Sequence, residues 1–184
     1  ACEATPSGMI AIVGASPAQL DELCAKTGCT PANINSAAQV VLSGDKAQIA
    51  AAAATAKELG IKRAIPLATA GAFHSKFMQP AREKLAPVLD GITFHAPKIP
   101  VISNVTGRVH SSDPAEIKDV MLRQVTETTR WADDIAAAKA LGCTRFIEFG
   151  PGKVLSGLIK KIDAALTTLN VSDLATLDAT VSAL

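Results

Sequence analysis

His74 is the first candidate for chemistry in this chain, which holds three histidines among its 184 residues. It lies between Phe73 and Ser75, just after residues 62–69, a run that predicts a strand. Open α/β sheets place functional groups at the carboxyl ends of their strands, where a neutral imidazole can take the proton of a Ser or Cys nucleophile. A histidine that only hydrogen-bonds within its loop accounts for the local pattern at least as well. Ser75 is a poor nucleophile for His74, because the side chains of neighbouring residues diverge.

Two further features are compatible with binding. The stretch FIEFGPGKVLSG (146–157) predicts a strand, a tight turn and a helix, and the helix N-terminus beside Lys153 could hold an anion. Neither phosphate-binding glycine pattern fits it, and a purely structural turn is the alternative. Asn33 and Asn35 alternate on one face of a predicted strand, where they could orient a polar group or bind neighbouring backbone.

Several kinds of site are not supported by the sequence. The nucleophile elbow G-x-S-x-G is absent, since the nearest match, Gly14-Ala15-Ser16, lacks the final glycine. The four cysteines have neither redox nor zinc spacing and the histidines are far apart, so we expect no metal. Cys24 falls on the apolar stripe of a predicted helix and is expected to fill the core.

Composition describes a globular protein without nucleic-acid or membrane partners. Hydrophobic residues make up 48% of the chain, the net charge is +1, and no long run of like charge occurs. The chain has no Tyr and one Trp, which argues against a surface of stacked bases. No apolar stretch approaches the length of a transmembrane helix, no signal peptide is evident, and cysteine usage predicts the cytoplasm.

The first third of the chain predicts a ferredoxin-like β-α-β-β-α-β unit. Its helices are marked by Ser16-Pro17 and by Asp45 at their N-termini, with Gly28 and Gly60 at their ends. The four expected strands are residues 9–14, 32–36, 39–44 and 62–69, and Pro66 indicates that the last of these lies at an edge.

The remainder alternates helices and strands in the manner of an α/β layer fold. Helices are expected over residues 76–89, 114–125, 132–142, 151–162 and from Ser172 onward, and strands over residues 92–94, 99–105, 144–150 and 166–171. We therefore expect two parts: a small subdomain of residues 5–69, and residues 70–184, which are few for a complete doubly wound sheet.

Five stretches together resemble malonyl-CoA:acyl carrier protein transacylase. They are ANINSAAQVVLSGD, GAFHSKFMQPAREKL, IPVISNVTG, RQVTETTRW and FIEFGPGKVLSGLIKKI, in the family's order and at its approximate spacing. The resemblance covers nearly the whole chain, from Glu3 onward. It implies that residues 70–184 are the C-terminal part of the large α/β-hydrolase-like acyltransferase subdomain.

The resemblance implies a two-step acyl transfer. A serine takes malonyl from coenzyme A as an ester, and the phosphopantetheine thiol of acyl carrier protein then takes it from the serine, with no cofactor. His74 matches the family's general base, and Gln124 matches the residue whose backbone carbonyl orients that ring. Phe73 matches the aromatic residue of malonyl-selective members, while Asn33 and Asn35 match a polar pair facing the cleft.

The chain also departs from the family pattern. The family's nucleophile elbow, oxyanion loop and carboxylate-binding arginine lie upstream of the stretches matched here. We therefore expect a C-terminal part that is inactive alone and that partners its own missing N-terminal segment, coenzyme A thioester and acyl carrier protein. Basic residues such as Lys76, Arg82 and Lys160 could meet an acidic carrier. The rival hypothesis is a non-catalytic ferredoxin-like binding module.

Overall fold

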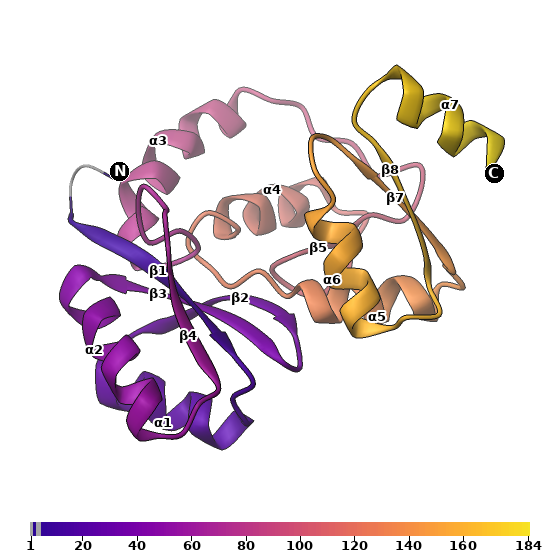
Figure 1. The fold of residues 1–184 in the computed structure, drawn as a ribbon. Helices are drawn as coiled ribbons and strands as arrows, with labels where there is room; N and C mark the ends of the chain where they lie inside the picture. Colours follow the sequence, from indigo (N-terminus) through magenta and orange to yellow (C-terminus); the bar gives the residue numbers. More distant parts are fainter. Residues whose placement is uncertain (1, 3–4) are drawn as a thin grey trace. The chain divides into compact units, whose positions relative to one another are not determined.

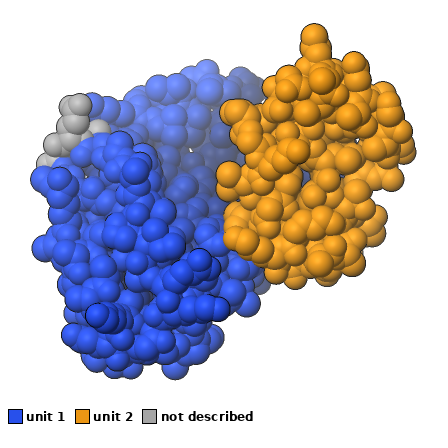
Figure 2. Space-filling model, viewed as in Figure 1, with its two compact units in different colours: residues 1–134 blue, residues 135–184 orange. Residues whose placement is uncertain are grey.

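The computed structural model describes residue 2 and residues 5–184. The chain divides into two compact units, one ending at Asp134 and the other beginning at Ile135 (Figure 2). This division does not coincide with the expected boundary between residues 69 and 70. Residues 5–69 nevertheless form a layer of their own within the first unit, and their status as a subdomain stays a prediction.

The first unit begins with a four-stranded antiparallel sheet covered by two helices (Figure 1). The elements are, in order, β1 (Ser7–Val13), α1 (Pro17–Thr27), β2 (Thr30–Ser36), β3 (Gln39–Asp45), α2 (Lys46–Glu58) and β4 (Arg63–Leu67). The spatial strand order is β2-β3-β1-β4, with antiparallel neighbours throughout. This is the ferredoxin-like arrangement expected from the sequence, with Pro66 in an edge strand as predicted.

Local capping explains where both helices begin. The side chains of Ser16 and Asp45 each accept a hydrogen bond from the backbone amide three residues on, while the side chains of Gln19 and Gln48 accept one from the cap residue's backbone amide. Such reciprocal caps satisfy amide groups that the first helical turn cannot pair. Gly28 ends α1 at φ 71°, a left-handed conformation that glycine adopts without steric cost.

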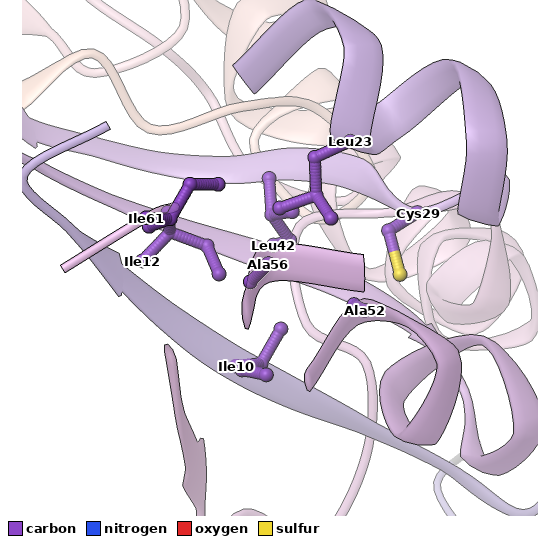
Figure 3. Close-up of a cluster of buried hydrophobic side chains, with 8 residues drawn as sticks. All are labelled: Ile10, Ile12, Leu23, Cys29, Leu42, Ala52, Ala56 and Ile61. Carbon is purple, nitrogen blue, oxygen red and sulfur yellow. The ribbon is translucent and has the colours of Figure 1, made fainter. Parts of the chain in front are cut away.

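The main core lies between the sheet and its helices (Figure 3). It consists of Ile10, Ile12, Leu23, Cys29, Leu42, Ala52, Ala56 and Ile61. Cys24 packs against this cluster, as expected, and burial raises the pKa of its thiol to about 11. A second, smaller cluster of Met9, Ala11, Ala32 and Val41 lies on the face of the sheet opposite the helices.

The rest of the first unit consists of helices and two very short strands joined by loops. It comprises the short helix η1 (Lys76–Met78), α3 (Gln79–Asp90), β5 (Ile102–Ser103), β6 (Arg108–Val109), α4 (Pro114–Arg123) and the start of α5 (Trp131–Ala140). The strand expected over residues 92–94 is wrong, and that over 99–105 reduces to Ile102–Ser103. Prolines 97 and 100 remove amide donors there, and a strand forms only where a neighbour pairs with it.

The second unit is a β-α-β crossover followed by a helix. Its elements after α5 are β7 (Arg145–Phe149), α6 (Val154–Ile162), β8 (Thr167–Val171) and α7 (Leu174–Ser182), all close to the expected ranges. Strands β7 and β8 pair in parallel, which the intervening helix makes possible. None of the helices built from the described residues is long and apolar enough to cross a membrane.

Candidate active site

His74 lies in the loop after β4, and its ring is held by Gln124. The ring Nδ1 lies 2.9 Å from the backbone carbonyl oxygen of Gln124, which follows the last residue of α4. Among the described residues, His74 is the one non-glycine residue with a positive φ, 55°. Residues in this left-handed region carry steric strain that surrounding contacts must offset. The chain therefore imposes one backbone conformation on the histidine and one orientation on its ring.

The hydrogen bond selects a tautomer of the ring. A carbonyl oxygen can only accept, so at 2.9 Å His74 donates from Nδ1–H. The side-chain amide Nε2 of Gln124 lies farther from Nδ1, at 3.3 Å, and also donates to Thr129 Oγ1 at 3.1 Å. The neutral ring consequently keeps its lone pair on Nε2, which is the form required of a general base.

A cavity of about 380 Å³ opens beside His74. Its walls come from β2, from the loop and η1, and from the segment after α4; they include Thr30, Pro31, His74, Lys76, Arg123 and Arg130. The Arg123 guanidinium donates to both carboxylate oxygens of Glu127, at 2.8 and 3.0 Å, and lowers the pKa of that carboxyl below its ordinary value. The cavity thus combines a proton acceptor with several cationic side chains.

Two serine hydroxyls of the sheet and one of the loop itself hold the His74 loop in place. Ser43 of β3 donates to the carbonyl of Phe73 at 2.6 Å, and the amide of Ala72 donates to Ser7 of β1 at 3.1 Å. Ser75 donates to the carbonyl of Ala72 and accepts from the amide of Phe77. Ser75 is buried and occupied in this way, so it is not available as a nucleophile for His74.

The segment after Gln124 is attached to the free edge of β2. Thr129 donates from its amide to the Ala32 carbonyl and accepts from the Ile34 amide, both at 2.8 Å. The Thr128 hydroxyl also donates to the Pro31 carbonyl at 2.8 Å. Both the histidine and the carbonyl that orients it are therefore anchored to the same four-stranded sheet.

The remaining expected site residues lie outside this cavity wall. Phe73 is 37% exposed and contributes its carbonyl, not its ring, to the hydrogen bonds around His74. Asn33 and Asn35 are half-buried in β2, whose pairing shifts between Pro31 and Asn33 and again between Ile34 and Ser36. The shifts break the simple alternation expected from the sequence. The functional roles of all three residues stay predictions.

The helix N-terminus that follows the GPGK turn of the second unit is already hydrogen-bonded to a carboxylate of the same chain. The carboxylate of Glu148 accepts from the amides of Leu155 and Ser156 at 3.0 and 2.8 Å, and these bonds lower its pKa. The Asn170 amide donates to the carbonyls of Glu148, Gly150 and Gly152. Because a carboxylate already fills this helix N-terminus, the structural interpretation of the turn is favoured over anion binding. The described residues contain no group of three or more potential metal ligands.

The residues that hold the site together were not predicted from the sequence. Ser7, Ser43 and Thr129 make contacts between parts of the chain far apart in sequence, which no local pattern reveals. One signal was available: Ser43 directly follows the apolar run VVL, at a strand position whose side chain the sheet buries. A buried hydroxyl needs a hydrogen-bond partner, and here that partner is the carbonyl next to the histidine.

Comparison with known sequences finds close relatives of one kind. The chain is 41% identical to the malonyl CoA-acyl carrier protein transacylase of Bacillus subtilis (strain 168), over 99% of this chain and 60% of that protein. It is 37% identical to the protein of the same name from Salmonella typhimurium, over 98% of this chain and 60% of the relative. No family model matches the chain.

Solved structures give the same result. A malonyl-CoA-acyl carrier protein transacylase from Clostridium perfringens superposes with a TM-score of 0.90 at 38% identity, over 96% of this chain and 57% of that one. A malonyl-transacylase in complex with a type II polyketide synthase acyl carrier protein gives a TM-score of 0.91 at 33% identity, over 97% and 59%. The mixed α/β fold thus matches part of the fold of these enzymes.

The fold is that of part of an acyltransferase, the class to which these solved structures belong. In particular, the homologues of this chain are malonyl CoA-acyl carrier protein transacylases. The chain spans about 60% of the length of these relatives, in keeping with the C-terminal part predicted from the sequence.

Proposed function

We propose that this chain provides the general base of a malonyl transferase, which moves malonyl from coenzyme A to the phosphopantetheine thiol of acyl carrier protein in fatty-acid or polyketide synthesis. The observation that carries the proposal is the 2.9 Å contact between His74 Nδ1 and the Gln124 carbonyl, beside a cavity. The names of the homologues support the substrates.

In the first step, His74 Nε2 accepts the proton of a serine hydroxyl while the serine oxygen attacks the malonyl thioester carbonyl. The carbon–sulfur bond breaks, and the departing coenzyme A thiolate takes the proton from the imidazolium. The serine in question is supplied from outside the residues of this sequence, because G-x-S-x-G does not occur in it.

In the second step, the same nitrogen accepts the proton of the phosphopantetheine thiol, whose sulfur attacks the seryl ester. The ester carbon–oxygen bond breaks and the serine oxygen takes the proton back. Throughout, the Gln124 carbonyl keeps Nδ1 protonated and the ring aligned. Being neutral, this carbonyl stabilises the transient imidazolium less than the carboxylate of a Ser-His-Asp triad does.

We further propose roles for the residues beside the cavity. Phe73 limits the acyl group by crowding a branched α-carbon, an effect worth about 1–3 kcal/mol per methyl group. Asn33 and Asn35 bind polar groups of the substrate arm. The reaction as written needs no metal or redox cofactor, and we place it in the cytoplasm.

The carrier protein is proposed to meet the rim of the His74 cavity. Lys76 lines the cavity, and Arg82 donates to Thr126, another lining residue, at 3.5 Å. These cations suit an acidic partner. Lys160 is a weaker candidate, because its ammonium already donates to the carbonyls of Ala164 and Leu166. A structural relative is seen bound to an acyl carrier protein.

The test is a fusion in which the part of the Bacillus subtilis relative that this chain does not match is joined ahead of it. We expect the fusion to form a malonyl ester, detected by intact mass, and to transfer malonyl to acyl carrier protein. His74→Ala should lower the transfer rate by about 10²–10⁴-fold. His95→Ala is the matched control, because His95 is an exposed loop histidine that does not line the cavity.

Two results would contradict the proposal. One is a fusion whose transfer rate is unchanged by His74→Ala. The other is stoichiometric malonylation of any serine when this chain alone is mixed with malonyl-CoA, since we expect the isolated chain to be inactive. The rival binding-module hypothesis is disfavoured by the His74 loop, which covers part of the helix-free sheet face where a partner would bind.

A further inference from the structure

The hydroxyl of Ser43 lies at the point where the sheet meets the catalytic loop. Ser43 is 1% exposed and points to the helix-free face of the sheet, together with its cross-strand partner Met9. Its Oγ donates to the Phe73 carbonyl at 2.6 Å, a short and well-formed hydrogen bond. The Phe73 carbonyl belongs to the peptide group that joins Phe73 to His74. The bond therefore acts directly on the backbone that enters the histidine.

This location matters because His74 has φ 55°, a left-handed conformation that is uncommon and sterically strained for a residue with a Cβ. Rotation of the Phe73–His74 peptide group would relieve the strain, and it would also swing the ring away from Gln124. Ser43 opposes that rotation from below. The Ser7 hydroxyl, which accepts from the Ala72 amide at 3.1 Å, holds the preceding peptide group.

We propose that Ser43 is a positioning residue for the transfer reaction: by binding the Phe73 carbonyl it keeps His74 in its left-handed conformation and its ring on the Gln124 carbonyl. The inference about the reaction rests on the proposed function, but the inference about ring position does not. Ser43 touches neither substrate nor reacting atoms, and it acts through the backbone of His74.

The nitrogen chemical shifts of the His74 ring measure its position. In the chain labelled with ¹⁵N-histidine at alkaline pH, where imidazole is neutral, a single Nδ1–H tautomer gives two widely separated ring nitrogen shifts. His95 and His110 serve as internal references, and His74→Gln assigns the signals. We expect Ser43→Ala to reduce the separation of the His74 shifts by at least half, because the freed ring exchanges between tautomers.

Ser36→Ala is the matched control. Ser36 is also a buried serine of the same sheet, but its Oγ accepts from the Ala38 amide and does not touch the His74 loop. It should leave the His74 shifts unchanged. If Ser43→Ala does not fold, Ser43→Cys retains the size and a weaker donor, and should reduce the separation partially. Wild-type shifts in whichever Ser43 variant folds would overturn the proposal.

The consequence for catalysis is measured in the fusion described above. Ser43→Ala should lower kcat by about tenfold or more while leaving KM for malonyl-CoA within twofold, because alignment of the base affects the chemical step. A purely structural loss would lower the amount of active enzyme and would leave the His74 shifts of the folded fraction intact, which contradicts positioning. If the wild-type fusion is inactive, the proposed function fails, and the nitrogen shifts alone still decide whether Ser43 positions the ring.

Discussion

The backbone of His74 makes a prediction about stability that is separate from catalysis. At φ 55°, alanine keeps the steric strain whereas glycine removes it. We expect His74→Gly to be more stable than His74→Ala by about 1 kcal/mol, measured by urea unfolding. Ala51, an exposed position of α2, is the control: there we expect Ala51→Gly to be less stable than the wild type by about 0.5–1 kcal/mol. Equal stability of the two His74 variants would show that the loop does not hold the left-handed conformation.

Asp134 predicts a pH dependence. Its side chain is 5% exposed, and neither carboxylate oxygen has a hydrogen-bond partner among the residues that the structure describes. Burial, followed by the nearby Asp133 charge, raises its pKa from 3.8 to about 6. A carboxyl with a raised pKa binds its proton more tightly when folded, so its contribution to stability is present below about pH 4 and is lost as pH rises through about 6.

Asp134→Asn removes this titration. Relative to the wild type, we expect the free energy of unfolding of the variant to rise by about 2–3 kcal/mol when the pH is raised from 4 to 8. Urea unfolding of both proteins at both pH values measures this change. Burying the amide of the new asparagine costs the same free energy at both pH values, so this cost cancels when the two pH values are compared. Asp178→Asn is the control, since Asp178 is an exposed aspartate of α7, far along the chain from Asp134. If the difference in free energy of unfolding between Asp134→Asn and the wild type is the same at both pH values, Asp134 is not the group that titrates.

At the scale of elements, the contact between β3 and α2 predicts a difference between two glycines. Gly8 and Gly44 lie opposite each other on β1 and β3. A Cβ on Gly44 would lie 2.9 Å from Gln48 Cβ and 3.0 Å from Cys29 Sγ, whereas a Cβ on Gly8 would meet Ile49 at an ordinary 3.9 Å. The tight approach allows Gln48 to complete the cap of α2.

We therefore expect Gly44→Ala to destabilise the protein by about 1–3 kcal/mol. Gly8→Ala should be neutral or stabilise it by up to about 1 kcal/mol. Thermal and urea unfolding of the two variants measure the difference. If both variants change the free energy of unfolding by similar amounts, α2 moves at no cost to accommodate the added methyl group.

The same elements show what the sequence could and could not predict. The helices α1 and α2 were predictable because their caps, Ser16 and Asp45, act within a few residues. The strand expected over residues 92–94 was wrong because a strand is defined by a partner, and a short apolar run does not contain one. The contact of His74 with Gln124 spans 50 residues; it was expected from family resemblance, and no spacing rule predicts it.

At the scale of the whole molecule, the contact between His74 and Gln124 depends on the four-stranded sheet from two sides. The His74 loop is bonded to β1 and β3 through Ser7 and Ser43, and the segment after Gln124 is bonded to β2 through Thr129. These contacts lie within the first compact unit, which ends at Asp134. The sheet therefore serves as the support of the site as well as a layer of the fold.

The sheet in turn depends on the His74 loop, which covers part of its helix-free face. The helix-free face of the sheet carries the buried side chains of Met9, Ala11, Ala32 and Val41, and Ala72 lies against that face at 0% exposure. A chain cut after residue 69 retains the core between sheet and helices but exposes this second cluster. A chain cut after Gly142 retains both, with α5 intact.

We expect residues 1–69 to be less stable than residues 1–142 by at least about 2 kcal/mol, because exposing a buried Met or Val side chain alone costs about that much. Urea unfolding of the two truncated chains, followed by circular dichroism, provides the comparison. In the longer chain, the His74 nitrogen shifts should match those of the full chain, since the described hydrogen bonds of the ring and its loop lie within the first unit. If residues 1–69 are as stable as residues 1–142, the boundary at residue 69 separates independently folding parts, and the sheet does not need the loop that it supports.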